Sequence, residues 1–246
     1  MIILGTLVMF LLGTVTASSL LTFFWRQRQD KKWTDGRSIC DYCETRLPTS
    51  ALLPIVGIFL IQKCPNCKRS SPTYSMITEI LVGLAWAFIW LTFPKPIAWA
   101  SFIGSLIIIT TLLTIAIIDF YFMEIPISMI ICGTAAISLL FFVDKNHSPS
   151  IVSAVLGACI TLGFFLWQYV LSRGQWIGGG DLWVGAFLGF VFGWSHVVIV
   201  VAAGYGLAAF VSFIRVFMFP AKKYNLVPLG GFLCLSGTLF FLFDLL

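Results

Sequence analysis

The sequence predicts an all-α polytopic membrane protein with about eight transmembrane helices and one small aqueous loop. Hydrophobic residues make up 59% of its 246 residues and charged residues only 10%, whereas soluble domains carry ~25% charged residues. The mean hydropathy is +1.00. This composition excludes a soluble globular domain, a disordered chain and a secreted disulfide scaffold. The net charge of +5 does not indicate nucleic-acid binding, because basic residues in membrane proteins mark the cytoplasmic side.

Eight apolar runs are candidate spans, because ~20 apolar residues in a helix cross the bilayer core. They cover residues 2–25, 76–93, 97–118, 127–143, 150–171, 182–194, 197–219 and 226–244. The sixth run is short, and it could instead be a re-entrant or strongly tilted segment. The predicted organisation is a first transmembrane helix at 1–25, a loop at 26–75 and a transmembrane helical bundle at 76–246.

The basic residues predict the orientation of the chain. With eight spans, 13 of the 15 Lys and Arg residues fall on one side, and only Lys95 and Lys145 fall on the other. The 26–75 loop alone carries nine of them. The positive-inside rule therefore predicts that this loop is cytoplasmic.

Two CxxC pairs lie in the loop, separated by twenty residues: Cys40 with Cys43, and Cys64 with Cys67. Four thiolates at this spacing can bind one Zn²⁺ tetrahedrally. Such a site has no open position for water, so we expect a structural zinc ion that supplies folding energy to a loop with little core. Free or transiently disulfide-bonded thiols are the alternative, although the cytoplasm is reducing.

The sequence also predicts the surroundings of the apolar run in the loop and of the three other cysteines. The apolar run 52–61 between the two cysteine pairs is too short to span, so we expect it to lie against the membrane surface or on the helix bundle. Cys132, Cys159 and Cys234 stand alone in apolar runs. We expect all three to be small buried hydrophobic residues.

Two aspartates are predicted to lie at the same edge of the membrane. Asp119 ends the apolar run that begins at Ile97, and Asp181 follows three glycines. In the eight-span topology both lie at the cytoplasmic edge, where two carboxyl groups in one site can hold a single proton between them. Such a pair can polarise a peptide carbonyl and activate water, which is the chemistry of aspartic proteases.

The surroundings of Asp181 favour a packed site. Asp181, Gly185, Gly189 and Gly193 recur at every fourth residue, so they share one helix face, and small residues let another helix approach closely. Gly178, Gly179 and Gly180 leave the backbone bare, so an extended peptide could lie beside it. The structural alternatives are that Asp181 caps a helix and that Asp119 is an interfacial charge.

At these residues the chain resembles the type IV prepilin peptidases, the leader peptidase/N-methyltransferase family of GxGD-type membrane aspartic proteases. Matching segments occur in the expected order along most of the chain. They are Arg37–Cys43, Lys63–Cys67, Tyr74–Gly83, Asp119 with Ile125–Pro126, Gly178–Asp181 and Pro228–Phe232.

The resemblance implies an enzyme of the bacterial cytoplasmic membrane, with a cytoplasmic zinc loop. It would remove the leader from type IV prepilins or pseudopilins on the cytoplasmic side, after a Gly, with Asp119 and Asp181 as the catalytic pair. Many members also methylate the new N-terminus with S-adenosylmethionine. The matching Glu79 and Gly83 would then lie near the substrate, although Glu79 could equally be a buried carboxylate paired with a basic or hydroxyl group.

The sequence departs from the family at two places. The family's Gly-Ser-Phe-Leu-Asn motif reads Ala17-Ser18-Ser19-Leu20-Leu21 here, which bears on methylation and substrate binding. The usual Lys two residues after the second Asp is Trp183. Two other function classes stay open: a proton- or cation-coupled carrier that uses the two aspartates, and a non-enzymatic scaffold that docks through the zinc loop.

Overall fold

The computed structural model describes residues 2–30, 32, 40, 43, 45, 64, 66–69, 73–94, 97–143, 149–218 and 227–244. The apolar run 52–61 lies outside the described residues. All regular structure in the described ranges is helical, which confirms the predicted fold class. The helices are α1 (Ile2–Arg28), α3 (Thr73–Thr92), α4 (Trp99–Phe122), α5 (Ile127–Val143), α6 (Ile151–Leu171), α7 (Gly179–Met218) and α8 (Leu229–Asp244).

The chain divides into two compact units, residues 1–92 and residues 93–246. In the first unit α1 packs against α3. Gly5 of α1 lies against Trp90, and Gly13 lies against Gly83, so the two helices run antiparallel. A Cβ atom on Gly83 would lie only 2.7 Å from Thr14 Cγ2. The glycines therefore permit this close approach, as small residues do in membrane helix pairs.

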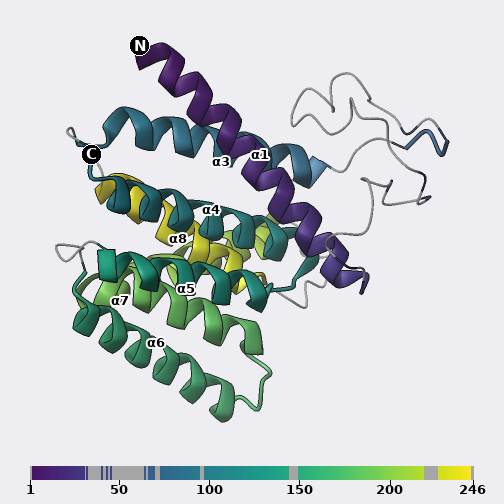
Figure 1. Cartoon of the computed structure of the whole chain (residues 1–246). Coiled ribbons are helices and arrows are strands. Elements are labelled where there is room, and N and C mark those ends of the chain that lie inside the picture. Colours follow the sequence, from purple (N-terminus) through teal and green to yellow (C-terminus); the bar gives the residue numbers. More distant parts are fainter. Residues whose placement is uncertain are drawn as a thin grey trace. The chain divides into compact units, whose positions relative to one another are not determined.

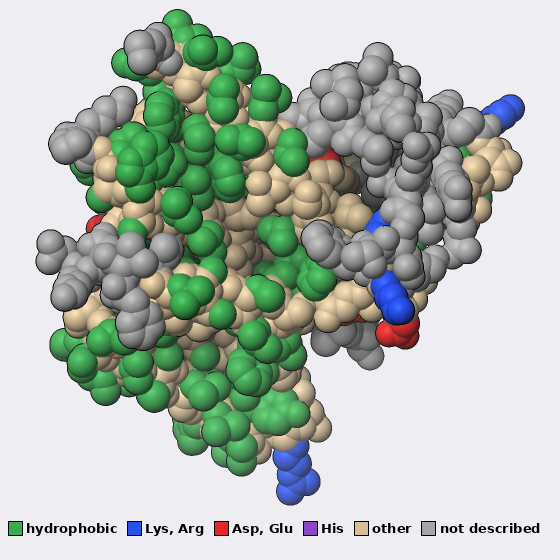
Figure 2. Space-filling view, in the orientation of Figure 1, with side chains coloured by type: hydrophobic (Ala, Val, Ile, Leu, Met, Phe, Trp, Pro, Cys, Tyr) green, Lys and Arg blue, Asp and Glu red, His purple; other side chains and the backbone are tan. Residues whose placement is uncertain are grey.

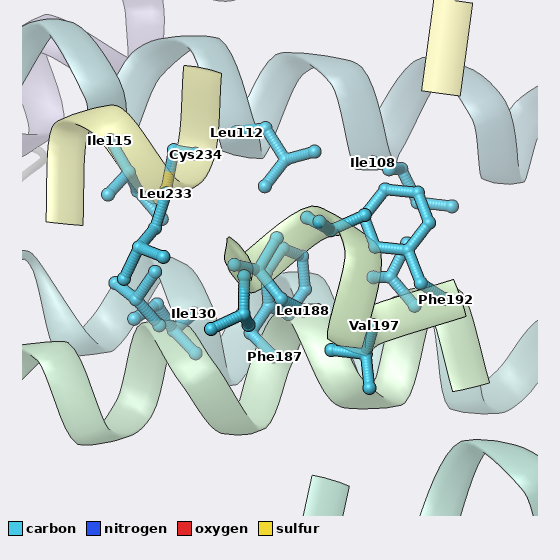
Figure 3. Close-up of a cluster of buried hydrophobic side chains, with 14 of the residues drawn as sticks. Ile108, Leu112, Ile115, Ile130, Phe187, Leu188, Phe192, Val197, Leu233 and Cys234 are labelled. Atoms are coloured by element: carbon cyan, nitrogen blue, oxygen red, sulfur yellow. The ribbon is translucent and has the colours of Figure 1, made fainter. Parts of the chain in front are cut away.

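In the second unit α4 is the most deeply buried helix. In its most apolar stretch 83% of the residues are buried, against 22% in α6. Helix α8 packs against both α4 and α7 and lies between them, while α6 packs on α7 (Figure 1). Figure 3 shows the core of this unit, where side chains of α4, α5, α7 and α8 converge around Leu188.

The range of α7 contains two helices that meet at a kink at Gly193, close to the predicted boundary between the sixth and seventh spans, 182–194 and 197–219. Gly193 has φ 66° and ψ 175°, a conformation that a residue with a side chain rarely adopts. Hydropathy places this boundary only approximately, because the apolar pattern continues through it, whereas the backbone conformation places the break at Gly193.

Five helices are long and apolar enough to cross a membrane: α1, α3, α4, α6 and α7, while α5 and α8 are shorter apolar helices. Hydrophobic side chains dominate the described surface in Figure 2. Such a surface suits contact with lipid, and the chain is a multi-pass membrane protein. Cys234 is fully buried, as expected, but Cys132 and Cys159 are exposed. That expectation was wrong for these two because lipid-facing positions are also apolar.

Candidate active site and metal centre

Asp119 lies in the last turn of α4 and is held by the first turn of α8. The Gly231 N–H donates to Asp119 Oδ2 at 2.6 Å. Gly231 is the third residue of α8, and the N–H groups of a first helical turn have no partner within their own helix. Asp119 supplies that partner from a position 112 residues away in sequence. The side chain is 5% exposed, so it is a buried group in the bundle and not an interfacial charge.

Asp181 is the third residue of α7 and uses one carboxylate oxygen to cap its own helix. The Gly178 N–H donates to Asp181 Oδ2 at 3.0 Å, which is the reciprocal half of a capping box. The alternative that Asp181 caps a helix is therefore partly right. However, the side chain is only 7% exposed, and its other oxygen faces a different helix.

Gly230 brings the two carboxyl groups together. A Cβ atom on Gly230 would lie 2.9 Å from Asp181 Oδ1 and 3.3 Å from Asp119 Oδ2. The two oxygens can therefore be no farther apart than the sum of these distances. The glycine stripe of α7 does face a neighbour, since Gly185 contacts Phe165 and Gly189 contacts Gly157 of α6. The Asp181 carboxyl group, in contrast, reaches α8.

The turn after α4 closes one side of this site. Met123 ends α4 with φ 55°, and Ile125 follows in the turn. A Cβ atom would lie 2.8 Å from Ile125 Cβ if placed on Gly180, and 2.7 Å from Ile125 Cδ1 if placed on Gly230. Ile125 thus fits against both glycines, which explains why neither position has room for a side chain.

Helix termini supply the electrostatic environment of the pair. The first turns of α7 and α8 direct backbone N–H groups at the two carboxyl groups, and a helix N-terminus carries positive potential. Neither carboxyl group forms an ion pair with a described residue. Trp183, which stands where the family has Lys, is 47% exposed. The site therefore places two acids side by side, supported by backbone dipoles.

Glu79 and Gly83 lie on α3, in the other unit. Glu79 is 3% exposed and accepts a hydrogen bond from the Ser75 hydroxyl at 3.2 Å. A hydroxyl partner was one of the alternatives drawn from the sequence. Gly83 contacts Phe10 and Thr14 of α1. Its evident role is helix packing, and a substrate contact for either residue stays a prediction.

The four cysteines of the loop converge as predicted. Their Sγ atoms all lie within 4.8 Å of one another. Cys40 Sγ is 3.7 Å from Cys67 Sγ, and Cys43 Sγ is 3.6 Å from Cys64 Sγ. A disulfide requires ~2.05 Å, so these thiols are not paired covalently. Four sulfurs at the usual Zn–S bond length of ~2.3 Å would be ~3.8 Å apart in a tetrahedron, and the cluster therefore fits such an ion.

Each cysteine pair is built by the same turn. The Cys40 N–H donates to the Thr45 carbonyl at 2.9 Å, and the Cys64 N–H donates to the Arg69 carbonyl at 2.8 Å. These equivalent bonds join each first cysteine to the fifth residue after it. Hydrogen bonding to the Thr45 side chain also lowers the pKa of the Cys43 thiol to about 6, which favours the thiolate that a metal binds.

The structure also identifies residues to which sequence reasoning gave no role. Gly231 and Ile125 appeared only within segments that resemble the family. A Gly-Gly pair at the start of a predicted helix was the available signal for Gly230 and Gly231, because it leaves the first N–H groups accessible. No local pattern identifies Ile125, since its two glycine contacts come from separate helices.

These features define a class: a multi-pass, all-helical membrane protein with a buried carboxyl pair and a four-cysteine cluster. Comparison with known proteins then identifies the family. The Bacterial Peptidase A24 N-terminal domain matches residues 11–93, and the Type IV leader peptidase family matches residues 106–213. The chain belongs to the type IV leader peptidase family, and it is a peptidase.

One curated relative is similar over most of its length. It is the "Prepilin leader peptidase/N-methyltransferase" of Bacillus subtilis (strain 168), 26% identical over 213 residues, which cover 82% of this chain and 82% of the relative. No solved structure matches the chain significantly. The resemblance drawn from the sequence is thereby confirmed at the level of the family.

Proposed function

We propose that this peptidase is a membrane aspartic endopeptidase with Asp119 and Asp181 as its catalytic pair. It removes the leader of type IV prepilins or pseudopilins on the cytoplasmic side, after a Gly. The observation that carries the proposal is the shared contact at Gly230, where oxygens of both carboxyl groups lie within 3.3 Å of one Cβ position. Family membership supports the substrate class.

The mechanism follows from two adjacent carboxyl groups that differ by one proton. The ionised member takes a proton from water as the water oxygen attacks the peptide carbonyl carbon, and the protonated member donates its proton to the carbonyl oxygen. This forms a neutral tetrahedral intermediate and exchanges the roles of the two acids. When the C–N bond breaks, a carboxyl group protonates the leaving nitrogen, and the other accepts the hydroxyl proton.

Gly178 and Gly179, which precede Asp181, leave space in which the leader can bind. Nothing lies within 4 Å of a Cβ atom placed on Gly179, and on Gly178 only Asp181 Oδ2 does. An extended chain can therefore approach the backbone beside Asp181 without a side-chain clash. Gly180, in contrast, is filled by Ile125 and belongs to the packed wall of the site.

The role of the cysteine cluster in this proposal is structural. Cys40, Cys43, Cys64 and Cys67 would hold a zinc ion, which has no open coordination position in such a site and stabilises the fold of its loop. On this proposal the zinc loop is cytoplasmic, on the side where the basic leader is found.

A second activity is suggested by the relative's name, which includes N-methyltransferase. We propose that Glu79 and Gly83 then lie near the new N-terminus and that S-adenosylmethionine is the methyl donor. Glu79 is a buried acid, and a carboxylate is a group that can accept hydrogen bonds from an amine. This activity is separable from cleavage.

One experiment tests both activities. Purified protein in detergent is incubated with a prepilin and S-adenosylmethionine, and the product is weighed by mass spectrometry. We expect cleavage after the Gly, abolished by Asp119→Asn or Asp181→Asn, and a further mass of one methyl group if the second activity exists. Cleavage that survives in both variants would contradict the aspartic mechanism.

The two other function classes predict different results. A carrier would show no cleavage, but proton or cation flux into vesicles that depends on Asp119 and Asp181. A scaffold would show neither, and it would lose partner binding only when the cysteines are replaced.

A further inference from the structure

A polar pair joins α6 to the second half of α7. The Tyr205 hydroxyl donates to Gln168 Oε1 at 2.9 Å. Both side chains are half-buried, while their neighbours on α6 are exposed apolar residues such as Trp167 and Leu171. Polar side chains on an apolar flank of a membrane helix are uncommon and usually functional. Neither residue has a role in the function proposed above.

The pair lies level with the aspartates. Helix α6 runs antiparallel to the first half of α7, since Gly157 contacts Gly189 and Phe165 contacts Gly185. Gln168 is three residues beyond Phe165, and Asp181 is four residues before Gly185. Antiparallel helices rise equally per residue, so Gln168 and Asp181 lie within one turn of the same depth. Asp181 and Gly185 also share one face of α7, and Gly185 contacts Phe165, which is three residues from Gln168 on α6.

Packing between these helices does not depend on the hydrogen bond. Gly157 and Gly189 bring the backbones of α6 and α7 into direct contact. The Phe165 ring stacks on the Tyr205 ring, with centroids 6.2 Å apart and an interplanar angle of 19°. A phenylalanine at position 205 would keep this stacking. The hydroxyl group is therefore not the main contact that holds the two helices together.

Its effect is to fix the orientation of the Gln168 amide. The amide oxygen accepts from Tyr205, so the Nε2 group with its two donors must point away from the phenol. Nε2 has no partner among the residues that the structure describes.

We propose that Gln168 is a substrate-binding residue, whose Nε2 donates to a backbone carbonyl of the prepilin leader beside the aspartate pair. Tyr205 is a positioning residue that holds the amide in this orientation. A backbone carbonyl is the acceptor that every leader presents, whatever its sequence. The inference rests on the proposed function, because it assigns the ligand to that same site.

The sharpest variant is Gln168→Glu. The carboxylate can still accept from Tyr205, but it lacks the donor. Gln168→Ala removes both, and Tyr205→Phe leaves the amide unconstrained. Tyr169→Phe is the matched control, since Tyr169 lies next to Gln168 on α6 and its hydroxyl makes no described bond to Gln168. The probe is a synthetic prepilin peptide with a basic leader, the junction Gly and the following apolar segment, in detergent micelles.

We expect Gln168→Glu and Gln168→Ala to raise KM about five- to tenfold with kcat within about twofold, as the loss of one hydrogen bond to substrate implies. Tyr205→Phe should raise KM less, and Tyr169→Phe should not change it. Binding of the same peptide to the uncleaving Asp119→Asn protein should weaken by the same factor when Gln168→Glu is added.

The two proposals fail separately. Normal KM and normal peptide binding in a stably folded Gln168→Glu protein, with Asp119→Asn inactive, would overturn only the role of Gln168. A loss of thermal stability with unchanged KM would show that the pair is structural, and it would overturn the inference too. Full cleavage by Asp119→Asn would instead overturn the aspartic mechanism on which both depend.

Discussion

The aspartate site and the cysteine site are assembled in different ways. Asp119 and Asp181 meet because three helix ends converge, and Gly230 provides their shared contact. The cysteines meet because two short turns of the same design each present two sulfurs. The first site depends on the packing of distant segments, and the second depends on local turns.

This difference predicts how each site tolerates damage. Added volume at a glycine should disturb the aspartate pair and leave the cysteines intact. Loss of one sulfur should empty the metal site and leave the aspartate pair assembled. The following predictions use this contrast, starting with the largest effect.

Asp119→Asn and Asp181→Asn should each reduce leader cleavage by at least ~10²-fold, the lower range for a lost acid–base group. Metal analysis of the same protein should show unchanged zinc content, because the cysteines belong to the other unit. Asp244→Asn, an exposed position at the end of α8, should behave as wild type. A similar loss in that control would mean that cleavage responds to any change in acidic charge.

Gly230→Val should reduce kcat by about 10- to 100-fold, because misplacing catalytic groups by ~1 Å has effects of this size. Its Cβ would lie 2.7 Å from Ile125 Cδ1 and 2.9 Å from Asp181 Oδ1. Gly163→Val is the matched control on α6, where nothing lies within 4 Å of an added Cβ. Equal activity in the two variants would show that Gly230 does not set the geometry of the pair.

Cys64→Ser should abolish stoichiometric zinc binding, since three thiolates and a hydroxyl no longer form the four-thiolate site. Leader cleavage should fall by less than about tenfold, because no acid–base group is lost. Inductively coupled plasma mass spectrometry and the cleavage assay measure the two quantities. Cys159→Ser, an exposed and isolated cysteine, should retain full zinc. A cleavage loss as large as that of Asp119→Asn would give the metal site a catalytic role.

Ser236→Ala should lower the free energy of unfolding by about 0.6 kcal/mol, the average for a hydrogen bond between membrane helices. The Ser236 hydroxyl donates to the Val200 carbonyl at 2.8 Å and so links α8 to α7. Ser212→Ala removes only a bond within α7, to the Ala208 carbonyl, and it should have a smaller effect. Thermal unfolding in one detergent compares them, and an equal effect would exclude a stabilising link between the helices.

Much of the fold could be predicted because the bilayer imposes it. Long apolar runs have to be helical in lipid, and the helices start and end near the predicted residues. The break between the sixth and seventh spans was predicted, but its place at Gly193 was not, since its cause is a single backbone conformation. The packing of α8 against α4 and α7 could not be predicted either. Apolar side chains indicate that a helix is buried, but they do not indicate which helix it packs against.

The candidate site likewise has residues that the sequence indicated and residues that it did not. The residue types and spacing indicated Asp119, Asp181 and the four cysteines, because intramembrane acids and paired thiols are uncommon and chemically specific. The backbone donors Gly178 and Gly231 have no side chain, so no residue type in the sequence indicates their role. Their role appears only when the ends of α7 and α8 are seen against the carboxyl groups.

The first turn of α8 has one more consequence. It touches both acids at once, and they remain almost shielded from solvent, at 5% and 7% exposure. A peptide that reaches between them has to shift Gly230 first. On the proposed function, the substrate itself therefore has to move the start of α8 before the two acids can act on it.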